Sequence, residues 1–261
     1  MWEMYGKCPG GKSMTERSFE MIKTTKLTKK YGTKTAVDGL DLCVYEGELF
    51  SLLGVNGAGK TTTIRMLSCL SKPAAGEAVV GGYSVKEAPE EVKKIIGIST
   101  QNTAVAERLT VRENLRFMAS LHYTDKAKIE ERTNEMIQVF RFQEVENQLA
   151  KTLSGGWQRK LSIAMALIGD PKVLFLDEPT LGLDVLARRE LWKMIERIKE
   201  HRTIILTTHY MEEAEALSDR IAILQNGRLK ALGTLQEIEE KAGVKGLENA
   251  FVEIAGKEES L

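Results

Sequence analysis

The chain has 261 residues, of which 43% are hydrophobic and 28% are charged, and its 37 basic residues balance its 37 acidic ones. This composition is typical of a globular protein with one large core or two modest ones. A formal net charge of zero provides no general positive field for nucleic acid or anionic lipid, and no apolar run approaches the ~20 residues of a membrane-spanning helix.

The first segment, residues 1–20, mixes glycine, serine, lysine and glutamate without periodicity, and we expect a disordered leader with alternative starts at Met14 and Met21. It lacks the apolar centre of a signal peptide, which favours a cytosolic location. Residues 6–13 match a glycine-rich phosphate-binding pattern. No apolar strand precedes them and Pro9 removes one N–H donor, so we interpret this match as a coincidence.

Two strand-like segments come next. The first begins near Ile22 and leads to Tyr31, and residues 36–44 alternate in the manner of a half-buried strand. Two antiparallel strands beside a nucleotide site would place Tyr31 where its ring could stack on a base, although a lone tyrosine is more often an ordinary core or surface residue.

An apolar strand at residues 49–53 then runs into a glycine-rich turn and a segment with helical spacing. The turn reads Gly54-Val55-Asn56-Gly57-Ala58-Gly59-Lys60-Thr61-Thr62. Glycines allow successive N–H groups to point at one anion, and the helix adds its positive N-terminal end. The pattern predicts a phosphate-binding P-loop in which Lys60 reaches the β- and γ-phosphates and the Thr61 hydroxyl coordinates Mg²⁺.

Short apolar strands and helices alternate through the rest of the chain. We predict a turn at residues 73–77, strands at 78–80, 95–99, 172–178 and 203–208, a mainly helical section to about residue 150 opened by a capping box at Thr110–Glu113, a hairpin around Asn226-Gly227, and a last helix opened by a capping box at Thr234–Glu237. This alternation indicates an α/β protein whose parallel sheet is covered on both faces.

Acidic and polar side chains stand at the ends of two predicted strands. Asp177 ends its strand on the edge where the P-loop lies, so it can hold Mg²⁺, and the adjacent Glu178 can act on water as a general base. His209 ends the next strand and could hydrogen-bond a γ-phosphate. Transfer of a phosphoryl group from ATP to water needs these functions.

A second anion-binding device is Ser154-Gly155-Gly156 at the start of a helix. Alone, such a turn is usually a loop and cap. A helical section separates it from Lys60, so it cannot easily serve the same γ-phosphate. Two chains arranged head to tail around a two-fold axis would solve this, because each Ser154 would close the other chain's nucleotide.

In this order the segments resemble the nucleotide-binding subunit of ABC transporters, over residues 22–255. The resemblance implies a P-loop NTPase with a RecA-like parallel-sheet core, a small antiparallel β subdomain and an α-helical subdomain inserted at about residues 102–160. It implies an ATP-binding domain at residues 21–255, followed by a tail at 256–261.

The resemblance also implies roles for individual residues. It implies that ATP is bound by Tyr31, Gly54, Asn56, Gly57, Ala58, Gly59, Lys60, Thr61 and Thr62, and across the dimer by Ser154, Gly155 and Gly156. It assigns the Mg²⁺ ligands to Thr61, Gln101 and Asp177, and it makes Glu178, His209 and Gln101 catalytic. The loop that communicates across the dimer falls on residues 181–184.

Two positions depart from the family's pattern: Trp157 stands where the signature usually has glutamine, and Leu181 where the cross-dimer loop usually has serine. Both concern the geometry of signalling across the dimer and leave Ser154 and Glu178 in place. Residues 153–160, 179–184 and 247–254 look like the branch that drives drug, lipid or polysaccharide exporters.

The function that this resemblance implies is ATP hydrolysis by a dimer at the cytoplasmic face of the cell membrane, which powers export through a permease on a separate chain. The dimer is of identical chains or of this chain and a similar one, and we expect no nucleic acid partner. The alternative is a soluble ABC ATPase of DNA repair, chromosome organisation or translation, and such proteins usually carry long insertions that are not present here. A small-molecule kinase would leave Ser154 and His209 without a role.

Overall fold

The computed structural model describes residues 19–200 and 202–256. The P-loop-like match at residues 6–13 and nearly all of the expected leader and tail lie outside the described residues. The described residues divide into two compact units, one of residues 19–93 with 208–256 and one within residues 94–207. Among the described residues, no helix combines the length and the apolar character that a membrane span requires.

The first unit contains an antiparallel sheet whose strand order is β2-β1-β4-β5. Its strands are β1 (Glu20–Tyr31), β2 (Lys34–Tyr45), β4 (Ala75–Val80) and β5 (Tyr83–Ser84). The predicted turn at residues 73–77 is shorter than expected, because Ala75 and Glu77 already pair with Thr28 and Thr25 of β1.

A second group of strands in this unit includes the one that precedes the P-loop. Strand β3 (Leu49–Leu53) runs parallel to β9 (Arg220–Gln225), which pairs with the antiparallel β10 (Arg228–Gly233). Between β9 and β10, Asn226 (φ 50°) and Gly227 (φ 77°) both adopt left-handed backbone geometry. A two-residue hairpin turn of this kind requires positive φ at both positions, so the predicted hairpin is confirmed.

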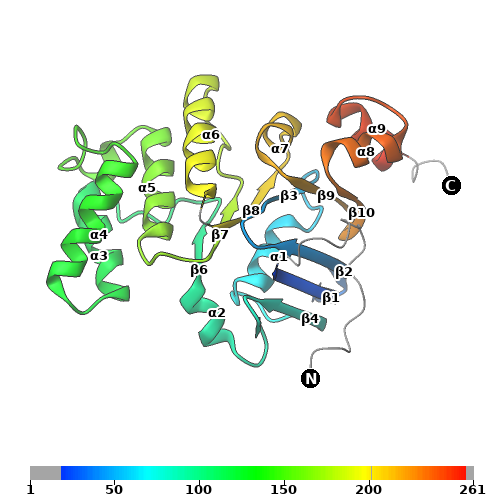
Figure 1. Ribbon diagram of the computed structural model, residues 1–261, viewed down its shortest axis with the longest axis horizontal. Coiled ribbons are helices and arrows are strands. Elements are labelled where there is room, and N and C mark those ends of the chain that lie inside the picture. The colour runs from blue at the N-terminus through cyan, green and yellow to red at the C-terminus, as the bar shows by residue number, and fades with distance from the viewer. Residues whose placement is uncertain (1–18, 201, 257–261) are drawn as a thin grey trace. The chain divides into compact units, whose positions relative to one another are not determined.

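Helices α1 (Lys60–Leu67), α7 (Met211–Leu217), α8 (Leu235–Ala242) and α9 (Leu247–Gly256) belong to the same unit. Figure 1 shows α8 and α9 lying together near the C-terminus. Both helices contribute to a buried apolar cluster: Phe251 and Ala250 of α9 and Ile238 of α8 pack with Leu53 of β3 and Ile223 of β9. The C-terminal helices therefore stabilise the strand that leads into the P-loop.

The second unit contains a parallel sheet in which β7 (Val173–Asp177) lies between β6 (Ile96–Ser99) and β8 (Thr203–Thr208). Every residue of β7 is buried, as a strand covered on both faces requires. The register pairs Asp177 with Thr207, so the acidic end of β7 lies beside the end of β8. Helix α2 (Pro89–Ile95) leads from the first unit into this sheet.

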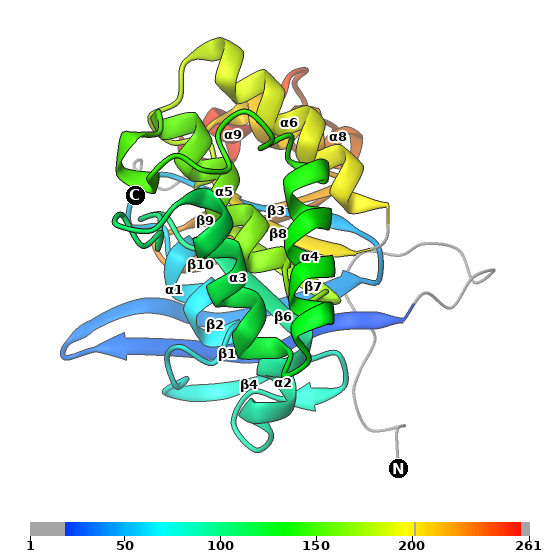
Figure 2. The ribbon, with the colours of Figure 1, turned by 90° about the vertical axis from the view of Figure 1, so that its left-hand side faces the viewer.

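The helices of the second unit are α3 (Val111–His122), α4 (Lys126–Val139), α5 (Gly155–Leu167) and α6 (Val185–Lys199), with a 3-10 turn, η1 (Ala150–Thr152). Figure 2 shows α3 and α4 side by side. The capping box at Thr110 and Glu113 is confirmed, as is the one at Thr234 and Glu237 that opens α8. The predicted helical section is interrupted after α4, because Arg141 adopts φ 58° and ends the helical path.

Candidate functional site

The glycine-rich loop of the first unit connects β3 to α1, and three of its positions have a backbone geometry or a close contact that favours glycine. Gly57 and Gly59 have φ of 84° and 103°, where other residues are strained. A Cβ atom on Gly54 would lie 2.4 Å from the carbonyl oxygen of Leu224, and one on Gly59 would lie 2.7 Å from that of Ala36. The glycines therefore fix how closely the loop approaches β9 and β2.

Backbone hydrogen bonds fix the shape of this loop. The Ala58 N–H donates to the Val55 carbonyl (3.1 Å), the Gly227 N–H donates to the Ala58 carbonyl (3.1 Å), and the Gly54 N–H donates to the Thr208 carbonyl (3.3 Å). Residues 55–57 are exposed, whereas the residues on either side are buried. The exposed part of the loop is thus the part that a ligand can reach.

Lys60 lies at the first position of α1 with only 5% of its surface exposed. Its Nζ donates to the carbonyl oxygens of Gly54 (2.6 Å) and Val55 (3.3 Å), so the ammonium group lies within the curve of the loop. Thr61 and Thr62 follow on the first turn of α1 and are partly exposed. A cation inside a loop of backbone N–H groups at a helix N-terminus is suited to bind phosphate.

Two other candidate residues belong to this unit. Tyr31 ends β1 with 48% of its surface exposed, and Lys29 Nζ lies 5.1 Å from the centre of its ring. His209 follows β8 and its ring lies 4.1 Å from that of Tyr210, whose N–H donates to the Thr208 hydroxyl (3.0 Å). The turn after β8 thereby holds His209 in a defined orientation.

The start of β3 is fixed by polar residues that the sequence analysis missed. The Asp219 carboxylate accepts from the Leu49 N–H (2.8 Å), and Arg220 forms an ion pair with Glu48 (3.2 Å). Burial raises the pKa of Glu48, although the Tyr45 N–H and Arg220 oppose that shift. The partners are about 170 positions apart in the chain, so no local pattern could have revealed them.

In the second unit the two acidic residues at the end of β7 are buried, Asp177 at 3% and Glu178 at 5% exposure. The Thr207 hydroxyl donates to Asp177 Oδ1 (2.5 Å), and the Glu178 N–H approaches both the hydroxyl (3.0 Å) and the carbonyl (3.1 Å) of Thr207. Glu178 adopts φ 49°, a geometry that costs about 1–3 kcal/mol in a non-glycine residue. Such strain concentrates at functional sites, and Thr207 helps to maintain it here.

Gln101, after β6, is exposed and is held through its backbone. The guanidinium group of Arg159, on α5, donates to the carbonyl oxygens of Thr100 (2.8 Å) and Gln101 (2.7 Å). The Ser162 and Ser99 hydroxyls join the same helix to β6 (2.8 Å). The sequence analysis did not single out Arg159, and its place three residues after the Ser-Gly-Gly turn was the available signal.

The Ser154-Gly155-Gly156 turn forms the N-terminus of α5. Ser154 caps the helix by accepting from the Trp157 N–H (3.5 Å), and Gln158 Nε2 donates to the carbonyl oxygens of Ala150 (3.1 Å) and Leu153 (3.3 Å). Among the described residues, no atom lies within 4 Å of the position that a Cβ on Gly155 would occupy. The start of α5 therefore has free space beside Gly155.

The structure thus groups the predicted residues within each unit. The P-loop, Tyr31 and His209 belong to the first unit, whereas Gln101, the Ser154-Gly155-Gly156 turn, Asp177 and Glu178 belong to the second. Among the described residues, no three His, Cys, Asp or Glu side chains form a cluster that could hold a metal ion. Mg²⁺ fits the oxygen donors that are present, since it is often bound by one carboxylate together with substrate phosphates and water.

Comparison with known proteins gives the family. The sequence model of the protein family described as "ABC transporter" matches residues 37–181 of this chain. The chain is 42% identical to the daunorubicin/doxorubicin resistance ATP-binding protein DrrA of Streptomyces peucetius over 88% of this chain and 70% of that protein. It is also 42% identical to the human phospholipid-transporting ATPase ABCA3 over 85% of this chain, but it spans only 13% of that protein's length.

Solved structures agree with these relatives. An ATP-binding subunit of an ABC transporter superposes with a TM-score of 0.81 and 31% identity, covering 90% of this chain and 99% of that one. The dimeric ATP-binding cassette MJ0796, in a post-hydrolysis state with ADP and phosphate, superposes with a TM-score of 0.74 and 27% identity, covering 82% and 99%. The expected α/β fold of a P-loop NTPase is therefore confirmed, and the chain belongs to the ABC transporter family as an ATP-binding ATPase cassette.

Proposed function

We propose that two cassettes, both of this chain or one of a similar subunit, close around two ATP-Mg²⁺ and power export through a permease on a separate chain. The observation that carries this proposal is Glu178, a buried carboxylate with left-handed backbone geometry directly after Asp177. A carboxylate fixed in this way can act as a general base toward water, as hydrolysis of ATP requires.

The first unit binds the nucleotide in this proposal. The ring of Tyr31 stacks on the base, and the backbone N–H groups of residues 54–62 surround the phosphates. Lys60, which already lies within the loop, neutralises charge on the β- and γ-phosphates. His209 donates a hydrogen bond to the γ-phosphate. The groups that face the phosphates are donors or cations, so together they oppose the negative charge of the bound nucleotide.

The second unit supplies the residues that act on water. Glu178 accepts the proton of the water that attacks the γ-phosphorus, while the bond from that phosphorus to the bridging oxygen of ADP breaks. Thr61, Asp177 and Gln101 would hold Mg²⁺, which supplies neutralising charge to the phosphates when it is bound. Gln101 also orients the water. Its backbone is fixed by Arg159, so its position depends on the helix that Ser154 opens.

Dimerisation completes the site in this proposal. Helix α5 begins beside free space at Gly155, and a helix N-terminus with free space next to it suits an anion that comes from outside the chain. We infer that the anion is the γ-phosphate bound to the partner's P-loop. The dimeric arrangement of the cassette MJ0796 supports this inference.

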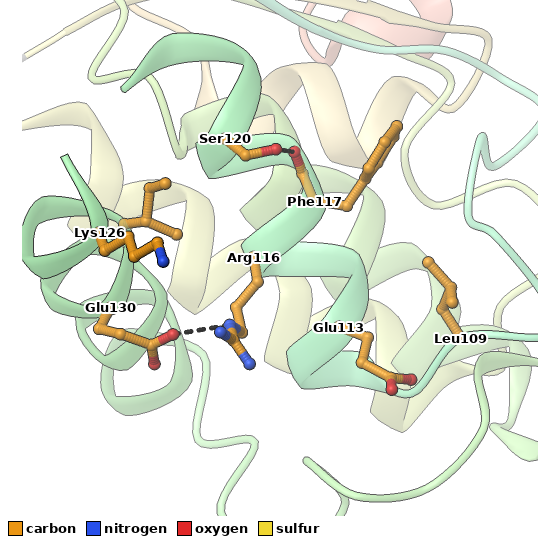
Figure 3. A pocket seen from close by; sticks show the side chains of 8 residues that line it. Leu109, Glu113, Arg116, Phe117, Ser120, Lys126 and Glu130 are labelled. Carbon is orange, nitrogen blue, oxygen red and sulfur yellow. Dashed lines mark hydrogen bonds and ion pairs between the residues drawn. The ribbon is translucent and has the colours of Figure 1, made fainter. Parts of the chain in front are cut away.

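The proposal of export rests on relatives whose names describe drug resistance and phospholipid transport. We infer a drug or lipid as substrate, and a position on the cytoplasmic face of the membrane. The permease needs a docking surface, and α3 and α4 provide a candidate. Between them lies a pocket of about 700 Å³, shown in Figure 3.

This pocket combines apolar and charged side chains. Phe117 is 54% exposed, and Leu109 and Ile129 line the pocket with it. Arg116 bridges to Glu130 across the two helices (2.6 Å), as Figure 3 shows. Bonds from the Thr110 N–H and hydroxyl lower the pKa of Glu113, which keeps that carboxylate ionised. A short amphipathic helix of the permease, with an apolar side chain over Phe117 and charged ends, would suit this surface.

The test is the substitution Glu178→Gln, which keeps the side-chain size but removes the base. We expect turnover to fall at least about 100-fold while ATP still binds, so that ATP-Mg²⁺ shifts the protein from monomer to dimer. Light scattering coupled to size-exclusion chromatography, beside the wild-type ATPase rate, measures both effects. Unchanged turnover in the mutant would exclude Glu178 as the base.

Membrane fractionation tests the permease part of the proposal separately. The protein should co-purify with a membrane protein from detergent-solubilised membranes. Recovery only in the soluble fraction under all salt conditions would count against a permease partner.

A further inference from the structure

Trp157 makes contacts that join the signature turn to the end of the helical section. Its ring lies 5.8 Å from that of Phe142 at an angle of 46°, and Phe142 in turn stacks on Phe140 (5.7 Å, 9°). Both phenylalanines are buried, and they follow directly after α4. Such aromatic pairs favour a defined orientation of the rings. The backbone N–H of Trp157 also donates to the Ser154 hydroxyl, so the indole and the turn belong to one local structure.

Trp157 is also linked to α6. Lys160 Nζ lies 4.5 Å from the centre of the indole and forms an ion pair with Glu190 of α6 (2.9 Å). A Cβ atom on Gly156 would lie 3.5 Å from Ala187 Cβ on the first turn of the same helix. Helix α6 begins directly after Asp184, whose carboxylate caps it. The indole therefore contacts both the segment after α4 and a lysine that is anchored to the helix that follows the 181–184 loop.

We propose that Trp157 is a positioning residue: through its contacts with Phe142 and Lys160 it fixes the Ser154-Gly155-Gly156 turn, and ATP-dependent assembly of two cassettes depends on it. This inference rests on the proposed function, because the turn acts on the partner's nucleotide. Glutamine at this position offers no aromatic face to Phe142 or Lys160. This chain thus holds its signature turn by contacts that only an aromatic residue can make.

The inference separates assembly from nucleotide binding within one chain. Trp157 belongs to the second unit, whereas the P-loop belongs to the first. Loss of the indole should weaken dimerisation and leave the intrinsic binding of ADP to the P-loop unchanged. A mutation that only destabilised the whole fold would weaken both.

The experiment measures, in the Glu178→Gln protein, the ATP concentration at which half of the molecules are dimeric, by light scattering. We expect Trp157→Gln to raise that concentration about 10-fold, equivalent to about 1.4 kcal/mol. Trp157→Phe keeps an aromatic face and should stay within about 3-fold of the parent. ADP affinity, measured by calorimetry, should be the same in all three proteins.

Lys160→Met provides a second variant in case Trp157→Gln does not fold. It removes the cation above the indole and the ion pair to Glu190, and we expect an increase of about 3-fold in the ATP concentration. Lys128→Met is the matched control, because Lys128 forms an ion pair of the same length with Glu131 on α4 (2.9 Å) without a contact to Trp157 among those described. In this control the ATP concentration at half-dimerisation should be the same as in the parent protein.

The outcomes are distinct. If Trp157→Gln needs the same ATP concentration for half-dimerisation as the Glu178→Gln parent, the positioning role is overturned and the proposed function stays intact. The same result for Lys160→Met has this meaning if Trp157→Gln does not fold. Equal defects in Trp157→Phe and Trp157→Gln overturn the aromatic contacts as its basis. If the Glu178→Gln parent does not dimerise at any ATP concentration, the two-cassette arrangement fails and the role of Trp157 fails with it.

Discussion

The P-loop of the first unit and the carboxylates of the second unit are held by different means. The P-loop gets its shape from glycines at positive φ and from close backbone contacts with neighbouring strands. A threonine hydroxyl on the adjacent strand bonds to both Asp177 and Glu178, and an arginine on α5 bonds to the backbone of Gln101. Backbone geometry thus shapes one region, whereas side-chain hydrogen bonds help to hold the other.

This difference has a consequence for mutations. A backbone cradle fails when a side chain is added, because atoms of neighbouring strands occupy the space. Carboxylates that are held by side-chain hydrogen bonds are displaced when the partner side chain loses its polar group, because a buried polar group then has no partner. The first kind of damage should abolish nucleotide binding, and the second should reduce turnover at nearly constant binding.

The largest effect is expected for Gly59→Ala. The added Cβ would lie 2.7 Å from the Ala36 carbonyl oxygen, and φ of 103° is strained for alanine. Together these should weaken ATP binding about 100-fold or more. Equilibrium dialysis measures the affinity for ATP. Gly243→Ala is the control, because Gly243 has φ 74° with nothing within 4 Å; it should lower stability by about 1 kcal/mol and leave ATP binding unchanged.

A smaller effect is expected for Thr207→Val. It removes the hydroxyl that donates to Asp177 and accepts from the Glu178 N–H, so both acidic residues lose a partner. Loss of a hydrogen bond to a charged group should lower kcat about 10-fold, with little change in ATP affinity. Thr133→Val removes an equally buried hydroxyl that bonds within α4. If it lowers kcat as much as Thr207→Val does, general destabilisation explains both.

The same contrast decides what the sequence could predict. The P-loop is a local pattern, and the flanking strand and helix occur as expected because apolar spacing and glycines lie within one short segment. The capping boxes and the Asn226-Gly227 hairpin were predictable for the same reason. The roles of the site residues remain predictions.

Other features depend on partners far away in the chain. Thr207 is 30 positions from Asp177 and Arg159 is 58 positions from Gln101, so only the sheet and the helix packing bring them together. Trp157 was visible in the sequence as a departure from the family's pattern. Its contact with Phe142 was not, because that aromatic packing depends on where α4 ends.

The smallest effect is expected for Arg159→Lys, which tests whether one side chain holds Gln101. The guanidinium group bonds two successive carbonyls at 2.8 Å and 2.7 Å, a fork that an ammonium group does not match. Loss of one of these bonds should let the Gln101 backbone move, and kcat should fall about 3-fold with the KM for ATP unchanged. Steady-state kinetics over a range of ATP concentrations separates the two parameters. An increase in KM at constant kcat would mean that Arg159 supports nucleotide binding, and the contrast between the two regions would then not hold at Gln101.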